Sequence, residues 1–233
     1  MRKILLMAAS AALALGSAAA SATAITSTFT ASGVTDSVSQ QATAQFSFLN
    51  ANTLSITLTD NVSPTADLLS ELVGLTFSFS SAPTDVQLTQ IVPTSIVDCT
   101  SSKSPCPTGS GTYPYGWGGT LNGSQLSIGA GFDGTSLFAH QPYGIVNANY
   151  TAPGGDTGLS SAANNPLLIG PVTFTFGITG LESIPEIMGV SFAFGTQPAN
   201  SQPGVAAVPE PRPVALLGIG LVGIWLVRRR RRA

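Results

Sequence analysis

Apolar and polar residues alternate with a period of two through the middle of the chain. Four segments carry a large apolar residue at every second position, with small or hydroxyl-bearing residues between them: 54–59, 75–80, 172–178 and 190–194. Successive side chains of a β-strand point to opposite faces of the sheet, so this alternation indicates strands with one buried and one solvated face. The sequence therefore predicts a protein built from β-sheet.

The connections between the predicted strands favour an antiparallel arrangement. Asn50-Ala51-Asn52 joins the predicted strands 43–50 and 53–60 into a hairpin, because Asn tolerates the left-handed backbone of tight turns. Shorter patterns predict one helical turn at 67–73 and further strands at 25–34, 86–92, 125–128 and 144–149. Strands linked by Gly- and Pro-rich segments without alternating helices are typical of an all-β antiparallel β-sandwich, of either jelly-roll or immunoglobulin-like topology.

Charged residues are scarce and unevenly placed. Only 9% of the residues are charged, and the basic ones cluster at the two ends, whereas 25–206 holds ten of the eleven acidic residues and one basic residue, Lys103. An acidic surface repels a phosphate backbone, so this distribution excludes a nucleic-acid-binding protein. A length of 233 residues fits one domain, 25–206, between two targeting segments.

The N-terminal segment 1–24 has the parts of a secretory signal peptide. Two basic residues precede the apolar run 4–15, and Ala22 and Ala24 supply the small residues of a cleavage site before Ile25. A cut after Ala20 and an uncleaved signal anchor are the alternatives, although this apolar run is short for a membrane span of about 20 residues. The segment predicts export from the cytoplasm.

The C-terminal segment 207–233 combines three features in order. Pro209, Glu210 and Pro211 come first, the apolar run 214–227 follows, and a basic tail comes last: Arg228, Arg229, Arg230, Arg231 and Arg232. As a helix the apolar run would be about 21 Å long, short of a hydrocarbon core of about 30 Å, but it can span a locally thinned bilayer. Because basic residues stay on the cytoplasmic side, the segment predicts one transmembrane helix with a cytoplasmic C-terminus.

This ordered segment resembles the PEP-CTERM sorting signal of bacterial envelope and extracellular proteins. The matching residues are Pro209, Glu210 and Pro211, the apolar run and the five arginines. The resemblance implies recognition by exosortase, a membrane transpeptidase that cuts at or near the motif. The precursor would then lie in the inner membrane, and the mature protein would reach the cell surface or the extracellular biofilm matrix.

A plain tail anchor is the alternative interpretation of the same segment. Two prolines fix extended backbone and stop the helix from growing upstream, so Pro209-Glu210-Pro211 could serve only as a stiff spacer. A glycolipid-anchor signal fits less well, because its apolar tail does not end in five arginines.

Residues suited to catalysis or metal binding are few in the central domain. Cys99 and Cys106, in an exported chain, predict a disulfide that closes the loop 100–105. The single histidine, His140, leaves too few ligands for zinc and no recognisable hydrolase triad, so we expect no metal, no cofactor and no enzymatic activity. Asp133 and Asp156 lie beside glycines and could supply oxygens to calcium, but solvated turn residues are the simpler interpretation.

Tyr113, Tyr115 and Trp117 form an aromatic cluster among prolines and glycines. Exposed aromatic rings stack on sugars, which would make the domain a carbohydrate-binding module of the exopolysaccharide matrix. The same rings could instead fold inward as a plug over the core, and we prefer this interpretation.

The polar faces of the predicted strands carry Thr and Ser rather than charged residues. Uncharged sheet edges do little to discourage pairing with another chain, so self-association is one interpretation, with loop coverage or glycosylation as the others. Taken with the targeting segments, the pattern predicts an exported surface or matrix protein with a structural or adhesive role.

Overall fold

The computed structural model describes residues 25–65, 67–98, 108–109, 116–131, 143–150, 159, 165–195 and 201–207. Within these ranges the chain forms thirteen β-strands and one 3₁₀ helix, and the strand pairs are antiparallel except for one. The prediction of an all-β, mostly antiparallel fold is confirmed. In the same ranges no helix is long and apolar enough to cross a membrane. The predicted signal peptide 1–24 and transmembrane helix 214–227 lie outside the described residues.

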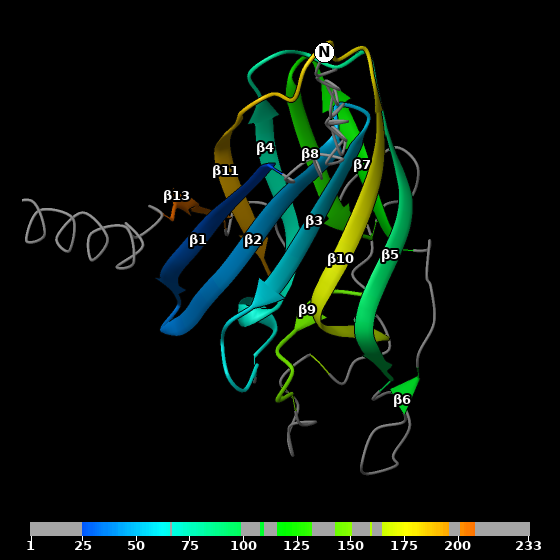
Figure 1. Cartoon of the computed structure of the whole chain (residues 1–233). Helices are drawn as coiled ribbons and strands as arrows, with labels where there is room; N and C mark the ends of the chain where they lie inside the picture. Colours follow the sequence, from blue (N-terminus) through cyan, green and yellow to red (C-terminus); the bar gives the residue numbers. More distant parts are fainter. Residues whose placement is uncertain are drawn as a thin grey trace, which may run out of the picture.

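The strands lie in two layers, one behind the other in Figure 1. The front layer consists, in hydrogen-bonded order, of β13 (Val205–Ala206), β1 (Ile25–Thr35), β2 (Val38–Asn50), β3 (Thr53–Asp60), β10 (Leu167–Thr179), β5 (Asp85–Val97) and β6 (Thr108–Gly109). The rear layer consists of β12 (Ser201–Pro203), β11 (Ile187–Phe194), β4 (Leu72–Phe79), β8 (Gln125–Ala130) and β7 (Trp117–Asn122). The short strand β9 (Ile145–Val146) pairs with both β4 and β10, so one hydrogen-bonded sheet runs through both layers.

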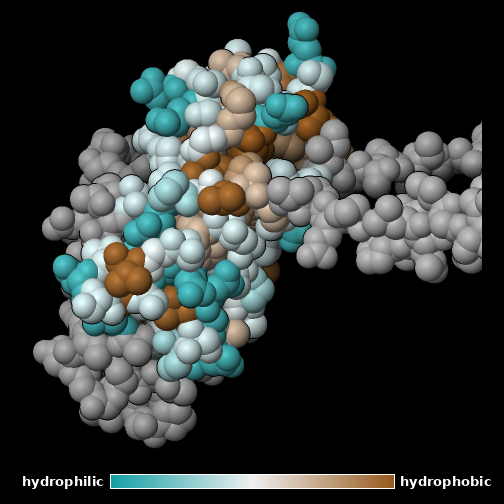
Figure 2. All heavy atoms as spheres, turned by 90° about the vertical axis from the view of Figure 1, so that its left-hand side faces the viewer, coloured by the Kyte–Doolittle hydropathy of each residue, from teal (hydrophilic) through white to brown (hydrophobic). Residues whose placement is uncertain are grey.

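The segment 201–207 also joins the two layers, at the edge formed by β1 and β11. Its first strand, β12, pairs with β11 of the rear layer, and after Gly204 the chain crosses to pair β13 with β1 of the front layer. A Cβ at Gly204 would lie 3.0 Å from the Phe192 ring, so the crossing leaves little room for a side chain. Figure 2 views the molecule from this side, where apolar and polar side chains are mixed.

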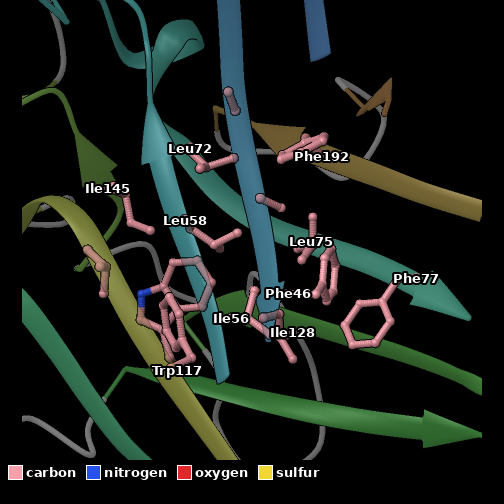
Figure 3. Packing of buried hydrophobic residues seen from close by; sticks show 14 of the residues in the cluster. Phe46, Ile56, Leu58, Leu72, Leu75, Phe77, Trp117, Ile128, Ile145 and Phe192 are labelled. Carbon is pink, nitrogen blue, oxygen red and sulfur yellow. The ribbon is translucent and has the colours of Figure 1, made fainter. Parts of the chain in front are cut away.

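The hydrophobic core lies between the two layers. Phe46 of β2 packs edge-on against Phe77 of β4, with ring centroids 4.9 Å apart. Trp117 of β7 packs on Phe174 of β10, with ring centroids 4.7 Å apart. Figure 3 shows such side chains from both layers pointing toward one another. Along β3 buried residues alternate strictly with half-buried ones, as the period of two predicts.

Two hairpins begin the front layer. The predicted hairpin between β2 and β3 is confirmed, and the Asn50 side chain accepts a hydrogen bond of 2.8 Å from the Asn52 amide across the turn. The hairpin between β1 and β2 was not predicted, because its turn residues, Asp36 and Ser37, lack the glycine that usually marks such turns. Both nevertheless have positive φ angles, 49° and 68°.

Other elements differ from the prediction in length. The expected strand 144–149 is only two residues long, because the Asn147 side chain turns to the backbone of Asp60 and accepts a hydrogen bond from the Asn149 amide. The expected helical turn 67–73 is limited to the 3₁₀ helix η1 (Leu68–Ser70), since β4 begins at Leu72. The strands β6, β7, β12 and β13 were not predicted.

Candidate functional site

Most of the residues that the sequence singles out lie outside the described residues. They are the cleavage residues Ala22 and Ala24, the cysteines Cys99 and Cys106, the tyrosines Tyr113 and Tyr115, the loop residues Asp133, His140 and Asp156, the motif Pro209, Glu210 and Pro211, and the tail Arg228, Arg229, Arg230, Arg231 and Arg232. The described structure therefore does not test whether these residues lie close to one another. Of the predicted site residues, Trp117 is described.

Trp117 occupies a core position. Its side chain is only 3% exposed, and its indole N–H donates a 2.7 Å hydrogen bond to the backbone carbonyl of Tyr143. One ring face packs on Phe174. These contacts are those of an inward-folded residue, so stacking on a sugar would have to come from Tyr113 and Tyr115.

A second site contains two buried carboxyl groups that the sequence analysis did not consider. Asp60 is the last residue of β3, and Glu71 lies between η1 and β4, so both belong to the end of the molecule that carries β9 (Figure 1). Both side chains are 0% exposed. Buried carboxyl groups are rare unless they are paired or bind a metal ion, so this pair is the candidate functional site.

Asp60 is held by hydrogen bonds from the loop that follows it. The Val62 amide donates to Oδ1 at 2.9 Å, and the Thr65 hydroxyl donates to Oδ2 at 2.6 Å. Thr65 is itself fully buried and accepts a 2.8 Å hydrogen bond from the Asn147 amide. The Asn147 side chain also donates to the Asp60 carbonyl at 2.9 Å. These bonds connect the loop after β3 to the residues after β9.

Glu71 has a fixed backbone and a carboxyl group without hydrogen bonds. Its amide donates to the Leu68 carbonyl at 3.2 Å, and its carbonyl accepts from the Gly195 amide at 2.9 Å. Within the described structure neither Oε1 nor Oε2 has a hydrogen-bond partner. A carboxyl group buried in this way loses its hydration without compensation.

The Glu71 carboxyl group lies against the backbone of Gly144. A Cβ built at Gly144 would overlap the Glu71 carboxyl group, so no larger residue fits there without moving Glu71. The Gly144 carbonyl accepts a 2.9 Å hydrogen bond from the Leu168 amide of β10. This bond fixes the backbone that lies against the Glu71 carboxyl group. The site therefore lies where β4, β9 and β10 meet.

Burial dominates the electrostatics of the pair. Burial raises the pKa of Asp60 from 3.8 to about 7, although the hydrogen bonds from Thr65 and Val62 oppose the shift. Burial, and then the nearby Asp60 carboxylate, raise the pKa of Glu71 well above its ordinary value. Burial and the Glu71 carboxylate also raise the pKa of Tyr150. The three groups therefore form one electrostatically coupled cluster.

No positive side chain balances this cluster within the described ranges, which contain no Lys, Arg or His. The charge of the two carboxylates can therefore be neutralised there only by protons or by a bound cation. All the donor atoms are oxygens, which suit hard cations such as calcium rather than zinc. In the described part of the chain, no group of three or more His, Cys, Asp or Glu residues lies close enough to hold a metal. A cation at the pair would thus need hydroxyl, carbonyl or water oxygens as further ligands.

The alternation of apolar and polar residues along β3 already indicated that Asp60 is unusual. It occupies the same strand parity as Leu54, Ile56 and Leu58, the buried positions of β3. A carboxyl group at a core position of an alternating strand is the kind of exception that marks a site. No comparable signal exists for Glu71, whose burial results from the packing of η1 and β9.

A surface groove lies between the free edges of β5 and β7. It has a volume of about 460 Å³ and is lined by residues 87–91 of β5 and by Trp117, Gly118 and Gly119 of β7. Among the described strands β7 pairs only with β8, so its other edge faces this groove. The groove is thus bordered by uncharged strand edges from both layers.

No protein-family model, curated protein or solved structure matches the chain.

Proposed function

We propose that this chain is the precursor of an exported surface or extracellular-matrix protein, which exosortase sorts and cleaves at Pro209-Glu210-Pro211. Its role is structural or adhesive rather than enzymatic. The mature part is a β-sandwich ectodomain that spans 25–206. Before cleavage the helix 214–227 holds it in the inner membrane, with the tail 228–232 in the cytoplasm.

One observation carries this proposal: the order of motif, short apolar run and basic tail at the C-terminus. Each part has a physical role in sorting, since the prolines keep the motif extended, the run enters the bilayer, and the arginines set the orientation. A chance occurrence of all three features in this order, behind an export signal, is improbable.

The end of the described fold supports the same proposal. Ala206 pairs with Phe29 of β1, and the Ala207 amide donates a 2.8 Å hydrogen bond to the Thr28 carbonyl. The sheet thus extends to within two residues of Pro209. A cut at or near the motif would release the domain with β13 still paired to β1.

Exposed apolar side chains on the face that carries β1, β11 and β13 support an adhesive role. Three of the large apolar side chains that are exposed belong to β1, β11 and β13: Val34, Met188 and Val205, which are 67%, 44% and 68% exposed. Figure 2 shows brown apolar groups among polar ones on this face. Contacts with other envelope components would cover such residues.

Mass spectrometry of the protein recovered from medium and envelope fractions of its native host tests the proposal. We expect a product that begins at Ile25 and ends between Val208 and Pro211. Glu210→Ala with Pro211→Ala should retain 214–232 in the product, whereas Pro213→Ala, outside the motif, should be processed normally. A wild-type product that keeps 214–232 would instead show a tail-anchored membrane protein.

A further inference from the structure

The buried pair of Asp60 and Glu71 requires a partner that the described residues do not supply. The Glu71 carboxyl group is fully buried, has no hydrogen-bond partner among the described residues, and lies near enough to Asp60 for the charge of that carboxylate to raise its pKa. A proton on Glu71 would reduce the charge but would leave its O–H without an acceptor in the described structure. A cation satisfies the oxygens of both carboxyl groups at once.

We propose that Asp60 and Glu71 bind one calcium ion, which joins the end of β3 to the start of β4 beside β9. The proposal goes beyond the sorting function, and only the supply of calcium outside the cytoplasm rests on the proposed export. Each carboxylate contributes negative charge and oxygen ligands. Water and nearby backbone or hydroxyl oxygens complete the shell, since calcium takes six to eight oxygen ligands.

Calcium fits the chemistry of the site better than other common cations. Zinc and copper favour Cys and His ligands, and the described ranges contain neither residue type. Magnesium demands nearly ideal octahedral geometry, whereas calcium tolerates the irregular arrangement that a loop such as 61–71 provides. An exported protein also meets calcium outside the cytoplasm at concentrations that suit an affinity of about 10⁻⁴ to 10⁻³ M.

The hydrogen bonds around Asp60 preorganise one side of the site. The Val62 amide and the Thr65 hydroxyl each occupy one carboxylate oxygen, and every carboxylate oxygen has a further lone pair for a cation. Thr65 is in turn fixed by the Asn147 amide. On the other side the Gly144 backbone limits the movement of Glu71.

The site has a structural role in this proposal. β9 pairs with β4 at Leu72 and with β10 at Leu168 and Ile169, so it links the rear layer to the front layer at this end. A cation between Asp60 and Glu71 adds a second link at the same place, because β3 belongs to the front layer and Glu71 precedes β4 of the rear layer. Calcium would then hold the two layers together.

Calorimetric titration and thermal unfolding of the full chain in detergent, after treatment with EGTA, test the proposal. At pH 8 we expect one calcium ion to bind per chain, and 10 mM calcium to raise the melting temperature by roughly 3 to 10 °C. At pH 5 the shift should largely disappear, because protons compete with the cation for the carboxylates of Asp60 and Glu71.

Three variants assign the effect to the site. Glu71→Gln and Asp60→Asn each remove one charged ligand and should abolish the calcium shift. Glu71→Gln should melt no lower than wild type in EGTA at pH 8, because it removes a buried charge. Asp85→Asn, which removes an exposed carboxylate at the start of β5, should keep the full shift.

Any of three results would overturn the proposal. Wild-type protein that neither binds calcium nor changes its melting temperature at pH 8 would show that protons alone neutralise the pair. A calcium shift that persists in both Glu71→Gln and Asp60→Asn would place the ion elsewhere, for example at Asp133 or Asp156. Magnesium that matches calcium in affinity would contradict the choice of cation.

Discussion

At the scale of the residue, the carboxyl group of Asp60 determines how the stability of the cation-free protein depends on pH. Its pKa rises from 3.8 to about 7 on folding, chiefly through burial. Between these two pH values the folded protein binds more protons than the unfolded chain, so the free energy of unfolding decreases as the pH increases. The raised pKa of Glu71 acts in the same direction.

We therefore predict that denaturant unfolding in EGTA gives a lower free energy of unfolding at pH 7.5 than at pH 4.5. The loss over this range should be about 3 kcal/mol from Asp60 alone. Asp60→Asn should make the slope of this profile clearly smaller, because the amide does not titrate. Asp85→Asn serves as the matched control and should retain the slope. A wild-type profile that is flat, or that rises with pH, would contradict the assignment of the shift to burial.

Trp117 shows at the same scale how a side chain that looks functional can belong to the core. Its ring packs on Phe174, and its N–H is bonded to the Tyr143 carbonyl. The sequence places it among Pro, Gly and Tyr, where the inward-folded plug was the preferred interpretation but exposed aromatic residues were the alternative. Only the pairing of β7 with β8 turns the residue inward.

At the scale of the element, the turn between β1 and β2 uses residues that are poorly suited to it. Asp36 and Ser37 both adopt positive φ angles, which disfavour residues with a Cβ, and Thr35 and Val38 pair on either side of them. β1 pairs with β2 along its whole length, and this pairing holds the two-residue turn in place. It does so although Asp36 and Ser37 do not favour the turn. A turn of this type prefers Asn-Gly.

We predict that Asp36→Asn with Ser37→Gly raises the free energy of unfolding by about 1 kcal/mol, or the melting temperature by roughly 2 to 4 °C. The control is a substitution that removes a turn glycine, in the hairpin between β7 and β8. Gly123 has a φ of 60°, so Gly123→Ala should lower stability although its Cβ would meet open space. Thermal unfolding measures both variants. A decrease for the Asn-Gly variant would show that Asp36 or Ser37 makes a compensating contact.

At the scale of the whole molecule, the segment 201–207 links the two layers at the edge formed by β1 and β11. It pairs with β11 through β12 and with β1 through β13, and the Gln202 side chain donates to buried Gln40 at 2.9 Å. Gln40 also donates to the Leu69 carbonyl at 2.8 Å. The segment therefore contributes to the fold although it lies directly before the proposed sorting motif Pro209-Glu210-Pro211.

We predict that a chain ending at Ala207 melts within about 1 °C of the product ending at Pro211, because both keep β13 and the hydrogen bond from the Ala207 amide to Thr28. A chain ending at Asn200 should melt lower by roughly 2 to 8 °C, because it loses several backbone hydrogen bonds and the cover of Phe192. Thermal unfolding of the three forms without the apolar run tests this. Equal melting temperatures would show that 201–207 does not stabilise the domain.

The sequence alone predicted the all-β class and the buried positions of the strands with regular alternation. Alternation with a period of two depends only on the geometry of an extended chain, so it predicted the buried faces of β3, β4, β10 and β11 without knowledge of their neighbours. The predictions of a signal peptide and a sorting signal are likewise local, because they depend only on the order of residues within 1–24 and 207–233.

Only the tertiary structure decided which strands are neighbours and which polar groups are buried together. The pairing of β3 with β10, and of β4 with β8, joins segments far apart in the chain, and no local pattern encodes it. The site of Asp60 and Glu71 follows from the same packing. A carboxyl group acquires its altered pKa and its need for a cation only when distant elements remove it from water, and that environment is a property of the folded chain.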